Sequence, residues 1–237
     1  ASVRPEIIDP IITSVVLVVN AKFDKNSTTK TAETLKSEIT TAISNYNLNT
    51  LTAFDGVFRY SKITGLIDNV DNSILSNITT VKIRKTFTPT LNSSTKYDVY
   101  FRNAIYNPHS GHESVLTSSG FKISGNTNEM FLDDDGMGNV RVYYLVSGIK
   151  TVQNATQGTI DYSTGQVTLN SLSVASISDI SGSATTNIEV TVSPKSNDVV
   201  PVRDQILEID VANSIVNVNE DTFVGGSSEA GVGYTTT

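Results

Sequence analysis

The run Ile11–Phe23 constrains the fold of this chain more than any other segment. Its sequence, IITSVVLVVNAKF, is rich in β-branched residues and almost continuous in apolar ones. Such a run is typical of a strand covered on both faces, or on one face with a partner on the other. The chain therefore needs a sheet around this strand and other elements that pack on it.

Two amphipathic helices are predicted after this strand, because apolar residues recur with helical spacing in residues 30–46 and again in residues 61–70. Residues 27–29 and Ser61 are candidate N-caps. The alternation in residues 79–87 then predicts a half-buried strand with one basic face. The first part of the chain is thus a strand–helix–helix–strand α/β module. The two stripes consist of Ala32, Leu35, Ile39, Ala42, Ile43 and Tyr46, and of Ile63, Leu66, Ile67 and Val70.

The pattern changes near Pro89, after which only short strands with turn residues between them are predicted. Two hairpins are well marked, at residues 133–139 and at residues 161–166, where Gly165 occupies the position that needs a positive φ. The predicted strands are residues 96–106, 114–123, 129–132, 139–146, 159–162, 166–169, 187–192, 206–211 and 215–218.

The predicted fold class is α+β, with the α/β module in residues 1–88. A mainly antiparallel, sandwich-like β domain follows in residues 89–224. Residues 225–237 have the composition of a flexible C-terminal tail, which either stays free or orders on a partner. The chain begins without Met, so we expect a fragment or a processed product. No apolar run reaches the ~18 residues of a membrane span.

The composition excludes several classes of site. The chain has no Cys, which excludes disulfides, thiolate metal sites and a Cys nucleophile. The net charge is −7, so a nucleic-acid partner is not expected. Charged residues make up only 17 %, which suits a protein whose surface meets other subunits, since charge is depleted at interface cores.

Two clusters invite a metal-site hypothesis. His109, His112 and Glu113 form an HxxHE sequence, but the reverse zincin order is HxxEH, and Pro108 and Gly111 place the cluster in a loop. We expect an exposed loop, with a metal-dependent hydrolase as the alternative. Residues 133–136 read DDDG, which invites a calcium site, but Met137 and Tyr144 stand where the EF-hand register needs ligands. We expect an acidic hairpin turn there.

No other catalytic pattern is found. Ser110 near the His pair lacks a G-x-S-x-G motif and an orienting Asp, and no glycine-rich phosphate loop precedes a helix. Lys82, Arg84 and Lys85 form a small basic patch, which is either a solvated sheet face or a contact with an acidic partner. We therefore expect no enzyme activity, no cofactor and no small-molecule substrate.

Several stretches carry a family resemblance when they are taken in order. The strand–helix–helix–strand segment resembles the C-terminal module of baseplate J-like proteins. The later stretches are similar to the C-terminal half of the baseplate wedge protein of T-even-like contractile-tailed bacteriophages. These stretches are residues 158–162 (GTIDY), 164–165 (TG), 193–194 (SP), 198–201 (DVVP) and 203–210 (RDQILEID), and the resemblance covers most of residues 5–221.

The resemblance implies a structural virion protein, assembled in the host cytoplasm and located in the tail baseplate. It implies self-association into a homodimer and a ring of dimers around the tail hub. It also implies contacts with other wedge and hub proteins, and rearrangement when the sheath contracts. The alternative left open is a carbohydrate- or receptor-binding β module of a tail fibre or bacterial surface protein, although the chain has no Trp.

The first candidate for the self-association surface is the apolar run of residues 199–202 with Ile206 and Leu207, which Pro201, Arg203 and Asp204 interrupt. Tyr100 is a second candidate, because the strand alternation turns it outward while Val99 and Phe101 face the core. The competing interpretation of the segment is the last core strand of its own domain. The predicted interface residues are Val199, Val200, Pro201, Val202, Arg203, Ile206, Leu207 and Tyr100.

Overall fold

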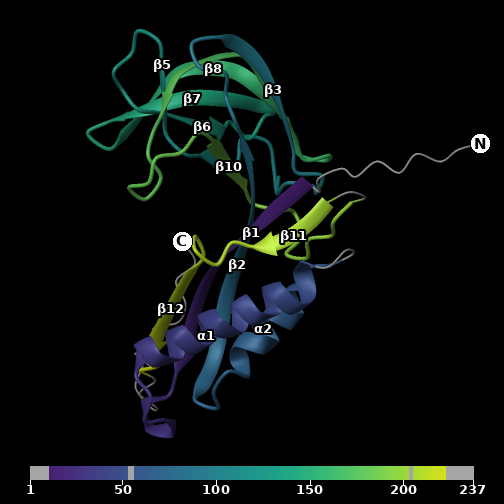
Figure 1. The fold of residues 1–237 in the computed structure, drawn as a ribbon, viewed down its shortest axis with the longest axis vertical. Coiled ribbons are helices and arrows are strands. Elements are labelled where there is room, and N and C mark those ends of the chain that lie inside the picture. The colour runs from purple at the N-terminus through teal and green to yellow at the C-terminus, as the bar shows by residue number, and fades with distance from the viewer. Residues whose placement is uncertain (1–10, 53–55, 203–204, 223–237) are drawn as a thin grey trace, which may run out of the picture.

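The computed structural model describes residues 11–52, 56–202 and 205–222, which form two lobes joined by one continuous sheet (Figure 1). One lobe carries both α-helices and is called here the α/β lobe. The other is a β-barrel and is called the barrel lobe. The chain is mostly antiparallel β, so the predicted α+β class describes only the smaller part of the molecule.

The α/β lobe is built around the first strand, β1 (Ile11–Phe23). On one edge it pairs antiparallel with β2 (Ile74–Phe87). On the other edge it pairs parallel with β11 (Gln205–Ile209) and then with β12 (Ile215–Glu220). The run Ile11–Phe23 is therefore a central strand, as its composition predicts.

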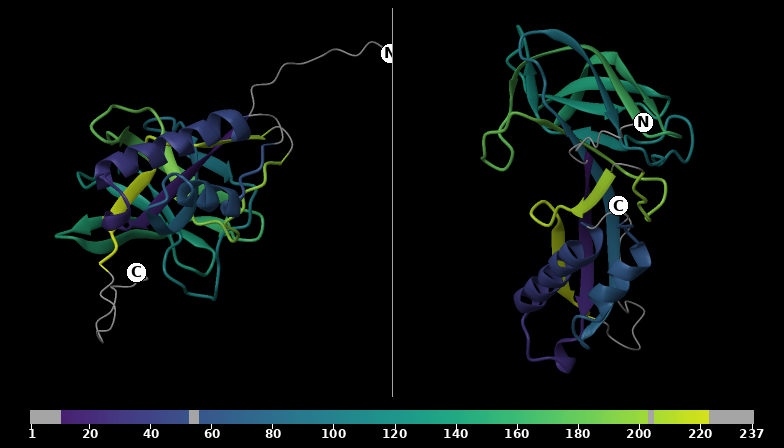
Figure 2. Two further views of the ribbon diagram at one scale, coloured as in Figure 1. Left: turned by 90° about the horizontal axis from the view of Figure 1, so that it is seen from below. Right: turned by 45° about the vertical axis from the view of Figure 1, so that its right-hand side comes forward.

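Both predicted helices are present and cover the same face of this sheet (Figure 2). They are α1 (Ala32–Tyr46) and α2 (Tyr60–Asp68), with a 3₁₀ turn η1 (Lys25–Ser27) before α1 and a π-helical turn η2 (Asn47–Leu51) after it. The N-cap of α1 is Thr31, whose side chain accepts from the Thr34 backbone nitrogen, and not a residue in 27–29. Because α1 begins at Ala32, the residue directly before it, Thr31, is the N-cap, and residues 27–29 lie too far upstream.

The alternation along β1 explains how the helices dock. Odd-numbered residues such as Val15 and Leu17 are fully buried and pair with Ile83 and Val81 of β2. The helical stripes bury against this face and form one core with it. The helix residues in that core include Ile39, Ile43, Ile63 and Ile67.

The opposite face of the same sheet is called here the helix-free face. It presents the half-buried Val16 and Val18 of β1, together with the exposed Ile78 of β2 and Ile215 of β12. Neither α-helix in the described part of the chain packs on this face (Figure 2). Among the described residues, no helix combines the length and apolar character that crossing a bilayer requires.

The barrel lobe closes on itself, which corrects the sandwich-like prediction. The circuit runs β6–β5–β9–β8–β7 and returns to β6, because β6 pairs with both β5 and β7. Its strands, with β3, β4 and β10 beside them, are β3 (Ser94–Tyr100), β4 (Leu116–Ser118), β5 (Phe121–Ile123), β6 (Met130–Asp134), β7 (Asn139–Val146), β8 (Ile149–Asp161), β9 (Gln166–Ile177) and β10 (Ile188–Val192). Long strands such as β8 and β9 can curve, which lets the sheet close through the β6–β7 pairing. The short strands predicted from the sequence favour two separate layers instead.

The two lobes share one strand. The first part of β2 pairs with β1, and its last part, residues 83–87, pairs with β10 at the barrel. Residues 205–220, which follow the barrel, return to the α/β lobe as β11 and β12. The predicted division into residues 1–88 and 89–224 stays a prediction. β11 and β12 belong to the second range but pair with β1 in the first. The predicted tail, residues 225–237, lies outside the described residues.

Candidate functional site

The predicted interface segment is divided between core and surface. Val199 is fully buried and exchanges two backbone hydrogen bonds with Phe58, which is also fully buried. Leu207 is fully buried in β11. The side chains of Val199 and Leu207 therefore pack inside the chain, in agreement with the competing core-strand interpretation, and only their neighbours face outward.

The remaining members of that segment are more accessible. Val200 is 47 % exposed and Val202 is 38 % exposed, while Pro201 and Ile206 are half-buried. Arg203 lies outside the described residues. For Val200 and Val202 the interface assignment stays a prediction.

Tyr100 lies on β3 as the alternation predicts. It is 47 % exposed, whereas Val99 and Phe101 on either side are buried. Its backbone pairs with that of Gln166 in β9. Its role as an interface anchor stays a prediction.

The loop that contains Val199 is held by Asp198. One carboxylate oxygen accepts from the Tyr60 backbone nitrogen at 2.8 Å, and the other accepts from the Arg59 guanidinium at 2.8 Å. These hydrogen bonds, first that of Arg59 and then that of Tyr60, lower the pKa of Asp198. A carboxylate at the first turn of α2 also meets the positive end of the helix dipole. The predicted cap Ser61 lies instead inside α2, and the loop is joined to the helix by a contact that periodicity cannot show.

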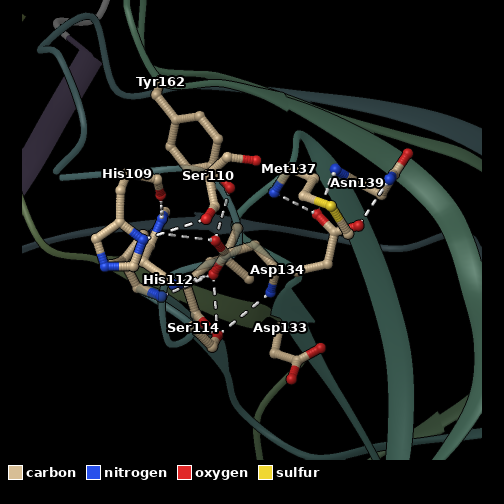
Figure 3. Close-up of polar contacts among 12 residues, drawn as sticks. His109, Ser110, His112, Ser114, Asp133, Asp134, Met137, Asn139 and Tyr162 are labelled. Carbon is tan, nitrogen blue, oxygen red and sulfur yellow. Dashed lines mark hydrogen bonds and ion pairs between the residues drawn. The ribbon is translucent and has the colours of Figure 1, made fainter. Parts of the chain in front are cut away.

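His109 and His112 lie in a loop, as their flanking residues predict (Figure 3). The Nδ1–H of His112 donates to the backbone carbonyl of His109 at 2.9 Å. Its Nε2 is buried without a hydrogen-bond partner and lies 3.6 Å from a carboxylate oxygen of Asp134. His109 and Glu113 are exposed as expected, but the expectation of an exposed loop is wrong for His112, which is buried. The metal-hydrolase alternative therefore has one buried imidazole and the Asp134 carboxylate at this place.

Asp134 is the centre of the contacts in Figure 3 and is fully buried. One of its oxygens accepts from the Ser114 hydroxyl and from the backbone nitrogens of Val115 and Leu116, at 2.9, 2.7 and 2.9 Å. The other accepts from the Tyr162 hydroxyl at 2.7 Å. This carboxylate therefore ties three segments together: the loop after His112, strand β6 and the hairpin at Tyr162.

The environment of Tyr162 reflects this contact. Burial, and then its hydrogen bond to the Asp134 carboxylate, raise the pKa of Tyr162 above its ordinary value. The ring also lies edge-on to that of His112, with centroids 5.5 Å apart. The phenol thus stays a donor at physiological pH, which is the role that Asp134 requires.

The other two residues of the acidic run have separate partners. Asp133 is buried and accepts bidentate hydrogen bonds from Arg141 at 2.9 and 2.8 Å and one from Lys150 at 2.6 Å. Asp135 accepts from the Met137 and Asn139 backbone nitrogens, as the predicted hairpin turn requires. The three carboxylates face different neighbours, so they do not converge on a cation. In the described ranges, no three His, Asp or Glu side chains are grouped so as to hold a metal ion.

The predicted basic patch of Lys82, Arg84 and Lys85, read as a solvated sheet face or a contact with an acidic partner, is buried at two of its three members. Arg84 is buried and pairs with Glu189 of β10 at 2.9 Å and with Asp210 after β11. Lys85 is buried and donates to the Ile12 carbonyl at 2.7 Å. Burial lowers the pKa of Lys85 to about 8, with a smaller contribution from nearby Arg102. These cations lie at the junction of the lobes, where distant strands supply partners that the local sequence does not show.

A cavity of about 720 Å³ lies beside Tyr162 in the barrel lobe. It is open to solvent and its lining is mixed, with Asn107, Asp161 and Lys195 among the polar side chains. Its lining includes Ser110 and Gly136 of the two clusters considered from the sequence, but neither cluster predicts a cavity at this place. Its mixed lining suits a small polar ligand better than an apolar one.

One family matches part of this chain. Residues 15–86 match the family described as "Baseplate structural protein gp6, C-terminal domain III". The matched range begins in β1 and ends in β2, so it contains both helices and the centre of the sheet in the α/β lobe. No curated protein matches the chain. The family match supports a structural protein of the bacteriophage tail baseplate.

Proposed function

We propose that the chain is a wedge component of a contractile phage-tail baseplate and acts by self-association, without enzyme activity. It forms a homodimer, and dimers join into a ring around the tail hub that takes part in rearrangement during sheath contraction. Its partners are further copies of itself and other wedge and hub proteins. Assembly takes place in the host cytoplasm.

The observation that carries this proposal is the family match over residues 15–86, which coincides with the lobe that has a helix-free face. The apolar residues of that face come from three adjacent strands. Val16 and Val18 lie at the centre, and Ile78 and Ile215, at 42 % and 52 % exposed, lie beside them. An accessible apolar patch built on a rigid sheet is typical of a protein–protein contact.

A ring also needs a second contact, because one isologous interface closes a dimer. The exposed Val200, Val202 and Tyr100 are candidates for it. They lie on other segments than the helix-free face, so both contacts can form at once. Each stable contact is expected to bury at least ~1,000 Å² in total.

The test is the mass of the full chain by light scattering across a range of concentrations. We expect a dimer or larger species at micromolar concentration. Ile78→Lys with Ile215→Lys should shift the equilibrium towards monomer, because two charges would be buried in the contact. Met137→Lys, which adds a charge at an exposed position in the barrel lobe, is the matched control. A monomer at every concentration would count against the proposal.

A second candidate function is glycan or receptor binding, and the 720 Å³ cavity beside Tyr162 is the observation in its favour. Sugars stack on aromatic rings and bond to amide and carboxylate groups, which Tyr162, Asn107 and Asp161 supply. A glycan array and thermal shift with the bound sugar would test it. Binding that Asn107→Ala abolishes would favour this function over the first.

A further inference from the structure

Strands β8 and β9 separate part of the way along the barrel wall. They pair only over residues 158–161 of β8 and 166–169 of β9. Beyond this, residues 149–157 of β8 pair with β7 alone among the described strands. On the edge that faces β8, β9 next pairs with β5 from Val174 onward, while its other edge pairs with β3 as far as Ser173. The barrel wall therefore lacks backbone pairing between β8 and residues 170–173 of β9, and a hydrogen bond from the Gln157 side chain to the Asn170 carbonyl closes one end of this gap.

A cavity of about 340 Å³ lies in this gap and is called here the seam groove. Its floor includes Val142 and Leu172, which belong to the barrel core. Its rim includes Gln153 and Asn154 on β8 and Ser171 on β9. None of the residues that line it is ionisable.

The seam groove has the chemistry of a site for an extended peptide. Unpaired strand edges offer backbone donors and acceptors, and peptides dock on such edges as added strands. The apolar floor favours an apolar side chain on every second residue. The uncharged lining excludes a segment whose charges would have to be desolvated without partners.

A segment of this chain fits those requirements. Residues 230–237 read AGVGYTTT and have no charged side chain. Val232 and Tyr234 lie two positions apart, so both would face the floor, and Gly231 and Gly233 would let the backbones approach closely. Val, Tyr and Thr also favour strands.

We propose that residues 230–237 of one copy dock as a strand in the seam groove of a neighbouring copy. This inference rests on the proposed self-association. It assigns the C-terminal segment to a partner contact and gives the free edge of β8 an occupant. The contact is heterologous, so it can propagate round a ring.

The length of the chain limits how far this segment can reach. The backbone nitrogen of Asp221 donates to the carbonyl of Phe23 at the end of β1 that is farthest from the barrel. Residues 222–229 can span at most about 28 Å when fully extended. β10 of the barrel lobe pairs with β2 from Ile83, which pairs with Val15 of β1, so that lobe begins about 26 Å along β1 from Phe23. Docking in its own chain would need a nearly fully extended connection even to the near edge of that lobe, so we assign the segment to a neighbouring copy.

The test uses thiol cross-linking, because the chain has no Cys of its own. Full-length Ser171→Cys and Val232→Cys chains are mixed and oxidised mildly. A docked segment brings the two thiols to an effective concentration near the mM range, so we expect at least about tenfold more mixed product than for the control. The control pairs Val232→Cys with Ser37→Cys, an exposed position on α1.

A synthetic peptide with the sequence of residues 223–237 should suppress the mixed product, and a scrambled peptide should not. Association by light scattering with no excess of mixed product would overturn this inference and leave the proposed function standing. A product that forms only within a chain carrying both substitutions would overturn the donation between copies. A monomer without any product would overturn both proposals.

Discussion

The carboxylate of Asp198 accepts a hydrogen bond from the Tyr60 backbone nitrogen at 2.8 Å and so caps helix α2 from 138 positions away in the chain. The same residue pairs with Arg59, and its neighbour Val199 bonds to Phe58. A loop that follows the barrel strands in sequence thereby stabilises the first turn of a helix in the α/β lobe. We therefore expect a substitution at Asp198 to lower the stability of both helix α2 and the predicted interface segment.

Replacing Asp198 with Ala should lower the free energy of unfolding by about 1 kcal/mol, the usual effect of losing an N-cap. The expected fall in Tm is about 2–4 °C for a chain of this size. Thermal unfolding followed by circular dichroism measures it. Asp179→Ala, at an exposed position, is the control and should leave Tm unchanged. An equal fall in both variants would contradict the capping role.

Replacing Asp134 with Ala should be far more destabilising, by about 3 kcal/mol or more, because several buried donors would lose their acceptor together. Urea unfolding measures the difference. Asp135→Ala is the matched control: its carboxylate serves an exposed turn, and we expect a loss of about 1 kcal/mol. Similar losses for the two would show that Asp134 does not organise the barrel wall.

Val199→Ala and Val200→Ala should separate folding from association. Val199 is fully buried, so its truncation should cost about 2 kcal/mol of stability through lost burial and an added cavity. Val200 is exposed, and its truncation should leave stability within about 0.5 kcal/mol. If Val200 lies in a contact between copies, only its variant weakens association at unchanged stability. Denaturant titration and light scattering on the same samples distinguish the two effects.

Lys85 should give stability a pH dependence above neutrality. Its pKa falls from 10.5 to about 8 on folding, so between these values the unfolded chain binds more protons than the folded one. Stability attributable to this residue therefore rises with pH across about 8 to 10.5. The difference in unfolding free energy between the wild type and Lys85→Met, measured at intervals from pH 7 to 10.5, should follow that rise. A difference independent of pH would contradict the buried, partly neutral lysine.

The sequence predicts best where a pattern is local. The apolar stripes locate α1 and α2 to within two residues at each end, and strand alternation places Tyr100 outside and Phe101 inside. The hairpin at Gly165 has the positive φ that its composition predicts, at 71°. In each case the neighbours in sequence are also the neighbours that decide the conformation.

The sequence predicts least where the partner is distant. Arg84 reads as a solvent-facing residue, and only the approach of β10 and the loop after β11 buries it between carboxylates. Residues 149–157 are mostly polar and show no apolar alternation. The first part of β8, and with it the closure of the barrel, therefore cannot be predicted from the sequence pattern. Asp134 reads as a turn residue, because its donors come from Ser114 and Tyr162 on other segments.

Strand β2 gives the molecule a mechanical property. Near Ile83 and Arg84, β2 pairs with β1 on one edge and with β10 on the other. The backbone hydrogen bonds of these two strand pairs join the lobes. A force directed along these strands loads many hydrogen bonds in shear, and they must fail together. A force across them would open the bonds one at a time. The joint is therefore expected to be stiff to tension along its length and compliant to twisting or sideways bending.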